Sequence, residues 1–207
     1  LLYAPAQTAP GCFSPASALH FCSVSLVDSP MRHAHLAAIT AAREAGAILS
    51  FDLNLRFPLW PNREQLRQTV WQFLPLTHIL KLSDEELPFL TGTEDIEAAL
   101  PALNTGDVQL VLYTCGSKGA RARARSPKET AVDTTGAGDG FIGSFLWQLQ
   151  RDGVITAELP KLSRKRLTEY QASSNRFCAI SVQHHGALDS YPTLAQMEQP
   201  ETDFPLP

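Results

Sequence analysis

The sequence predicts an α/β fold in three layers, with a mostly parallel central sheet covered by helices on both faces. The first observation is that short apolar runs alternate with longer stretches that carry helix-start and helix-stop signals. The second is that the 207 residues are 44% hydrophobic, which is enough to bury one substantial core. Strands that alternate with helices pair in parallel, so we expect one α/β domain over residues 1–207.

The expected strands are buried apolar runs that lead into polar residues. Because ligands of parallel sheets bind beyond the carboxyl ends of the strands, the polar residues that follow these runs are expected to meet at one crevice. The strands are expected at residues 18–26, 47–52, 78–82 and 107–114.

The expected helices begin at recognisable capping residues. Ser29 precedes Pro30, a residue favoured at the first helical position, and Asn62 precedes a second helix. The stretch from Ser83 to Glu86 fits a capping box, and Gly92 follows as a helix-stop signal. Helices are expected at residues 30–45, 62–74, 83–92, 138–149 and 168–183.

The most informative stretch is Asp-Thr-Thr-Gly-Ala-Gly-Asp at residues 133–139. Gly136, Ala137 and Gly138 have little or no side chain, so backbone N–H groups at a helix start can approach an anion directly. Asp139 falls in the first helical turn, where the helix dipole favours a carboxylate that can accept a proton from an alcohol. The alternative is a tight turn in which Asp139 only caps a helix.

This stretch resembles the C-terminal signature of the ribokinase-like, or PfkB, family of carbohydrate kinases. Other stretches agree with the family in the same order, and the resemblance covers nearly all of residues 19–193. Within the family, the Phe-Asp-Leu-Asn-Leu-Arg and Lys-Leu-Ser-Asp-Glu-Glu-Leu stretches look most similar to bacterial fructokinases. The supporting stretches are residues 51–56, 80–87 with 91–92, 113–119, and Asn175 through Gly186 and Ala187.

The resemblance implies a role for each motif. It implies that Asp139 is the general base and that the turn Gly136, Ala137, Gly138 is the anion hole. Ser83 stands where many relatives carry Asn. The resemblance also implies that Asn54 and Arg56 lie near the phosphoryl path and that Glu86 orients hydrated magnesium. The nucleotide contacts that it implies are Thr114, Gly116, Gly119, Ser83 and Asn175. The residues that it implies beside a monovalent-cation site are Asp133, Thr135 and Ser190.

Structural interpretations stay open beside these roles. Glu86 fits a capping box equally well, residues 52–56 fit a turn with a salt bridge, and residues 186–190 fit a surface turn. Arg121, Arg123 and Arg125 alternate with Ala, which would place three positive charges on one strand face near ATP, but the pattern is more typical of a solvated edge strand.

The implied activity is ATP-dependent phosphorylation of a sugar hydroxymethyl group, most simply fructose to fructose 6-phosphate, with Mg²⁺ and K⁺ as cofactors. Kinases for aminoimidazole riboside or 2-keto-3-deoxygluconate are alternatives within the family. A nucleotide-binding relative without catalysis is the alternative from another class, and it would bind ATP without sugar-dependent turnover.

Composition limits the kinds of partner and the cellular compartment that we expect for this protein. A net charge of −4 argues against a nucleic-acid partner, and no stretch reads as a signal peptide or a membrane span. The four cysteines are scattered without a C-x-x-C pair, so free thiols and a cytoplasmic enzyme are expected.

Measured against its family, the chain corresponds to the C-terminal two-thirds. The sugar-binding Gly-Gly motif and the β-lid of the family are not in it, and we expect missing segments before residue 1 and near residues 119–128. Because the lid usually forms the family's dimer contact, a homodimer stays possible.

Overall fold

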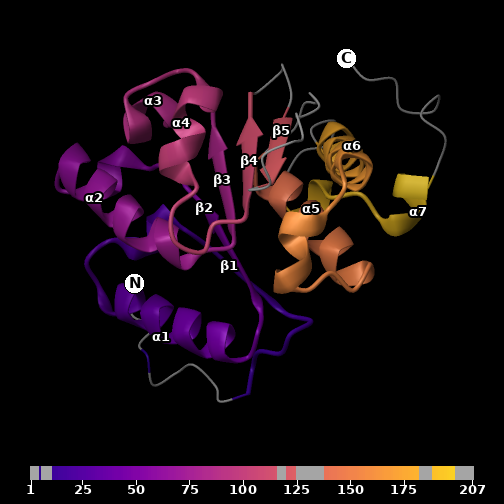
Figure 1. Ribbon diagram of the computed structural model, residues 1–207, viewed down its shortest axis with the longest axis horizontal. Coiled ribbons are helices and arrows are strands. Elements are labelled where there is room, and N and C mark those ends of the chain that lie inside the picture. Colours follow the sequence, from indigo (N-terminus) through magenta and orange to yellow (C-terminus); the bar gives the residue numbers. More distant parts are fainter. Residues whose placement is uncertain (1–4, 6–10, 116–119, 125–137, 182–187, 199–207) are drawn as a thin grey trace.

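One five-stranded sheet between two groups of helices organises the molecule (Figure 1). The structure is a computed structural model, and it describes residues 5, 11–115, 120–124, 138–181 and 188–198. The strand order along the sheet follows the chain, from β1 to β5.

Four parallel strands and one antiparallel edge strand form the sheet, which confirms the mostly parallel arrangement. The parallel strands come from the apolar runs, and each pairs with the next along the chain. The antiparallel strand is the Arg-Ala alternation that fits an edge strand. The strands are β1 (Ala18–Cys22), β2 (Ile48–Asp52), β3 (Ile79–Ser83), β4 (Leu110–Thr114) and β5 (Ala120–Ala124).

Helices cover both faces of this sheet, so the three-layer prediction is confirmed (Figure 1). One face packs against α1 (Pro30–Glu44), α2 (Arg63–Phe73), α3 (Glu86–Thr91) and α4 (Ile96–Leu103). The other packs against α5 (Gly138–Arg151) and α6 (Arg164–Ser181), with the short α7 (Leu194–Glu198) beside α6. Each parallel strand supplies alternate side chains to the two apolar cores. Within the described ranges, none of the helices combines the length and the apolar character that a bilayer crossing needs.

Several helix ends follow the sequence signals closely. The Asn62 side chain accepts a hydrogen bond from the Gln65 N–H at 2.8 Å, and Gly92 ends α3 in the left-handed region at φ +78°. Ser29 occupies the N-cap position of α1, but its hydroxyl donates backward to the Val27 carbonyl at 3.0 Å. The position of that cap was predictable, whereas its hydrogen bond was not.

Several elements differ from the sequence prediction. The strand expected at residues 18–26 ends at Cys22, and Ser23–Leu26 forms a 3₁₀ turn that still buries Leu26 completely. Helix α4 was not expected. Helix α6 begins at Arg164 rather than at residue 168 and ends at Ser181.

Helices α5 and α6 pack closely at the start of α5. A methyl group built on Gly140 would lie 3.2 Å from the Phe177 ring and 3.6 Å from the Cys178 sulfur. Further along, the buried Gln148 amide donates to the Tyr170 carbonyl at 3.0 Å and to the Ser174 hydroxyl at 3.1 Å. The start of α5 is therefore held in place by α6.

Candidate active site

The sheet face that meets α5 changes character along its strands. On β2 this face runs from Ile48 through Ser50 to Asp52, and on β3 it runs from Ile79 to Lys81. The apolar residues at the strand starts belong to the core under α5 and α6. Polar groups therefore gather at the carboxyl ends of the strands, where parallel sheets bind their ligands.

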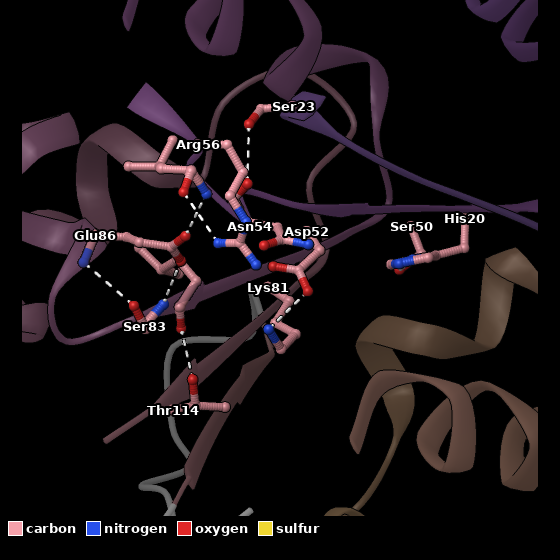
Figure 2. Close-up of polar contacts among 12 residues, drawn as sticks. His20, Ser23, Ser50, Asp52, Asn54, Arg56, Lys81, Ser83, Glu86 and Thr114 are labelled. Atoms are coloured by element: carbon pink, nitrogen blue, oxygen red, sulfur yellow. Dashed lines mark hydrogen bonds and ion pairs between the residues drawn. The ribbon is translucent and has the colours of Figure 1, made fainter. Parts of the chain in front are cut away.

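The strand register brings these polar residues side by side. Asp52 is paired with Lys81 across β2 and β3, and Ser83 is paired with Thr114 across β3 and β4. Figure 2 shows this group gathered around the ends of the three strands. The polar residues Asp52, Ser83 and Thr114 thus lie together at the strand ends, as the sequence predicts.

Glu86 fastens two of the strand-end loops together. One carboxylate oxygen accepts from the Ser83 N–H at 2.9 Å, and the other accepts from the Leu55 N–H at 2.9 Å. The Ser83 hydroxyl accepts from the Glu86 N–H at 3.3 Å, which completes the capping box (Figure 2). The structural interpretation of Glu86 is therefore correct. Each of its oxygens keeps a second lone pair that can accept from a metal-bound water.

The loop after β2 turns sharply at Asn54. This residue has φ of 38°, a left-handed conformation that Asn tolerates better than most residues. The Ser23 hydroxyl donates to the Asn54 carbonyl at 3.4 Å, and the Arg56 guanidinium donates to the Leu55 carbonyl at 3.2 Å. Arg56 is exposed, so its remaining donors face solvent at the edge of the strand-end group.

The first turn of α5 stands above the same end of the sheet. Gly138 and Asp139 open the helix and both are exposed. The charge of Asp139 influences the pKa of Asp52, of His20 and of Cys22, all on the sheet face that meets α5. The Asp139 carboxylate therefore belongs to the same electrostatic neighbourhood as the strand ends.

A buried ion pair at this site was missed by the sequence analysis. Lys81 donates to Asp52 at 2.7 Å, and the two side chains are only 6% and 2% exposed. Burial raises the pKa of Asp52 above the ordinary carboxyl value, and the Lys81 ammonium opposes that rise. The signal in the sequence is a lysine inside an otherwise apolar strand, because such a residue needs a buried partner.

His20 extends the polar group onto β1. Its Nδ1 lies 3.1 Å from the Ser50 hydroxyl on the neighbouring strand, and Figure 2 places both beyond Asp52 and Lys81. Desolvation and the nearby Lys81 charge lower the pKa of His20, while the Asp139 carboxylate raises it. The neutral imidazole is thus favoured beside the ammonium.

The remaining site residues fall into three groups. Thr114 is buried, and its hydroxyl donates to the Leu82 carbonyl at 3.5 Å. Asn175 is buried in α6, and its amide donates to the Gln171 carbonyl. Ser190 is also buried, and its hydroxyl shares a hydrogen bond of 2.8 Å with the Ser181 hydroxyl at the end of α6. Outside the described residues lie Gly116, Gly119, Asp133, Thr135, Gly136 and Ala137.

Solved structures share this architecture. The fructokinase from Vibrio cholerae O395 in a fructose-, ADP- and calcium-bound form superposes with a TM-score of 0.80 at 31% identity, covering 98% of this chain and 64% of that one. The aminoimidazole riboside kinase from Salmonella enterica, complexed with aminoimidazole riboside and an ATP analog, gives a TM-score of 0.75 at 29% identity, covering 94% of this chain and 65% of that one.

Sequence comparison points the same way. Fructokinase-1 of Zea mays is 38% identical over 192 residues, which cover 89% of this chain but only 58% of that protein. The chain therefore spans little more than half the length of such a relative. The model of the pfkB family of carbohydrate kinases matches residues 6–194, which is most of the chain. On these grounds the chain belongs to the pfkB carbohydrate kinase family.

Proposed function

We propose that the complete protein transfers the terminal phosphoryl group of ATP to a hydroxymethyl oxygen of a sugar, converting fructose to fructose 6-phosphate. The observation that carries this proposal is the exposed Asp139 carboxylate in the first turn of α5, above the polar carboxyl ends of the strands. The identity to plant fructokinases and the likeness to a fructose- and ADP-bound fructokinase support fructose as the substrate.

In this proposal the protein mainly positions the reactants and stabilises charge. Asp139 accepts the hydroxyl proton as the oxygen bonds to phosphorus, and backbone N–H groups of the turn Gly136, Ala137, Gly138 hold the phosphoryl oxygens. Exposed Arg56 is assigned to the phosphoryl path, and Asn54 shapes the loop that carries it. Nucleotide contacts are assigned to Thr114, Gly116, Gly119, Ser83 and Asn175.

We assign the triphosphate of ATP to the start of α5. Gly138 has no side chain, and a methyl group there would come within 3.4 Å of the Lys81 ammonium, so a cation lies beside the helix start that would bind the phosphates. Bound Mg²⁺ would neutralise phosphate charge, and Glu86 would hold one of its water ligands. We assign K⁺ to Asp133, Thr135 and Ser190; of these, only Ser190 is among the described residues.

The protein is expected to act in the cytoplasm as a monomer or homodimer, without a nucleic-acid partner. None of the four cysteines forms a disulfide, which suits a reducing compartment. The negative net charge disfavours a phosphate backbone as partner.

A riboside kinase is the second candidate. The structural likeness to aminoimidazole riboside kinase favours it, although the identity is lower than to the plant fructokinases. ADP release by the complete protein with Mg²⁺ and K⁺ tests both, using fructose, aminoimidazole riboside, 2-keto-3-deoxygluconate and no acceptor. Fructose-dependent ADP release supports the proposal, and turnover with another acceptor replaces the substrate. If the protein binds ATP but turns over none of the acceptors, the result contradicts the kinase proposal and supports the non-catalytic nucleotide-binding alternative.

Asp139→Asn tests the assigned base directly. The amide cannot accept the hydroxyl proton, so kcat should fall by about 10²- to 10⁴-fold while the dissociation constant for ADP stays within about twofold. Steady-state kinetics and calorimetric ADP titration measure the two effects. The exposed Asp28→Asn removes the same charge before α1 and serves as the control. Normal turnover in Asp139→Asn would remove the base assignment.

A further inference from the structure

Lys81 occupies an unusual position for a buried lysine. It lies in the middle of the sheet on β3, its side chain is 6% exposed, and its ammonium sits beneath the first turn of α5. A methyl group at Gly138 would come within 3.4 Å of that ammonium. The start of α5 and the Lys81 ammonium are therefore close neighbours.

The signs of the two charges explain why this arrangement is informative. A helix N-terminus carries partial positive charge and favours anions, so a buried ammonium beside it is electrostatically unfavourable by itself. Asp52 neutralises Lys81 from the neighbouring strand, but one oxygen of Asp52 is buried without a hydrogen-bond partner. The Lys81 ammonium and the positive end of the α5 dipole therefore lie close together at Gly138.

We propose that Lys81 contacts the phosphoryl group as it passes from ATP to the sugar, and that Asp52 is a positioning residue that holds the ammonium at the level of Gly138. This inference rests on the proposed kinase activity and adds a catalytic cation to it. Charge on the equatorial phosphoryl oxygens is stabilised by a cation whose position is fixed before the reaction begins. No covalent step is assigned to either residue.

The position of the ammonium distinguishes this pair from a purely structural ion pair between strands. A structural pair requires only that Lys81 binds Asp52, which the register of β2 and β3 already ensures. It does not require the ammonium to lie near the start of α5. The nearness of its ammonium to Gly138 places Lys81 at the candidate active site. His20 supports the same assignment, because its pKa is influenced by both Lys81 and Asp139.

The test uses the complete protein with four variants. Lys81→Met removes the charge, Lys81→Arg keeps it, and Asp52→Asn loosens the hold on it. Lys165→Met is the matched control, because Lys165 lies on α6 with 87% of its side chain exposed. Two quantities are measured: kcat with saturating sugar, and the ratio of the dissociation constants for ADP and for β,γ-methylene ATP.

The expected result is specific to a contact with the terminal phosphoryl group. Lys81→Met should lower kcat about 100-fold and weaken the ATP analogue more than ADP, while the KM for sugar changes little. Lys81→Arg should recover part of kcat. Asp52→Asn should lower kcat about tenfold, and Lys165→Met should match the unmodified protein.

Thermal melting shows whether each variant folds. The double variant Lys81→Met with Asp52→Asn serves as a second control, because it leaves no buried charge unpaired. If Lys81→Met alone unfolds, the double variant provides the same two readouts. An unchanged kcat and an unchanged ADP-to-analogue ratio in the folded variants would overturn the inference. If the unmodified protein binds nucleotide but phosphorylates no acceptor, the proposed function fails, and the nucleotide ratio alone decides whether Lys81 contacts the terminal phosphate.

Discussion

The carboxylate of Glu86 joins two segments of the chain, and its partner Leu55 lies 31 positions before it. It accepts from Leu55 after β2 and from Ser83 at the end of β3, so a single side chain sets the spacing between two segments of the candidate site. A capping residue is normally local to its helix. Here the same carboxylate also fixes tertiary structure, so its structural role and its proposed metal role place demands on the same two oxygens.

Replacing Glu86 with Gln tests the structural part of this role. The Gln amide offers one acceptor and one donor group, so one of the two backbone N–H groups loses its partner. The free energy of unfolding should fall by about 1–3 kcal/mol, as measured by urea denaturation of the complete protein. Glu85→Gln, one residue earlier and exposed, should change it by less than about 0.5 kcal/mol. Equal stability of the two variants would contradict the joining role.

At the scale of elements, the connection between α4 and β4 depends on one glycine. Gly106 has φ of 56°, and a methyl group there would overlap the carbonyl of Pro75. Asp107 donates its N–H to that same carbonyl at 3.0 Å, which draws the two segments together. The turn thus sets where β4 enters the sheet, and β4 ends at Thr114 in the candidate site.

Two glycine substitutions separate backbone strain from steric overlap. Gly106→Ala should lower the free energy of unfolding by about 3 kcal/mol, because it adds both left-handed strain and a clash with backbone. Gly92 has a similar φ of 78° with open space around it, so Gly92→Ala should cost only about 1 kcal/mol. Denaturant titration of both variants measures the difference. Equal losses would show that the contact with Pro75 relaxes freely.

For the whole molecule, the fold was largely predictable because each parallel strand is a short apolar run beside a clear helix signal. Helix α4 escaped prediction because Pro101 lies inside it, and proline normally argues against a helix interior. The Lys81–Asp52 pair also escaped, since its members are 29 residues apart and only the register of β2 and β3 brings them together. Sequence motifs therefore indicated the strand-end residues but not the pairing between strands.

The pH dependence of stability is also a property of the whole molecule. The His78 ring accepts a hydrogen bond from the Leu49 N–H at 3.0 Å, and burial lowers the pKa of His78 below 6.5. The unfolded chain then binds a proton at higher pH than the folded chain. The free energy of unfolding should therefore be at its full value above about pH 6.5 and decrease as the pH falls from there toward the lower folded-state pKa.

His78→Asn isolates this contribution. The Asn side-chain oxygen can accept from the Leu49 N–H but cannot titrate, so the decrease in stability below pH 6.5 should be smaller than in the unmodified protein. Asp52, whose pKa is raised, acts with the opposite sign and is present in both proteins. Urea denaturation at several pH values compares the two slopes, and identical slopes would exclude His78 as the source.

The close contact between Gly140 and Phe177 has an evolutionary consequence. A methyl group at position 140 would press on the ring at position 177, which would have to move by a few tenths of an ångström, although one residue follows the proposed base and the other lies on a different helix. A larger residue at 140 is therefore expected to occur together with a smaller one at 177. A larger residue at 140 beside an unchanged Phe177 would push on the turn that carries Asp139, so selection on catalysis would extend to this position of α6.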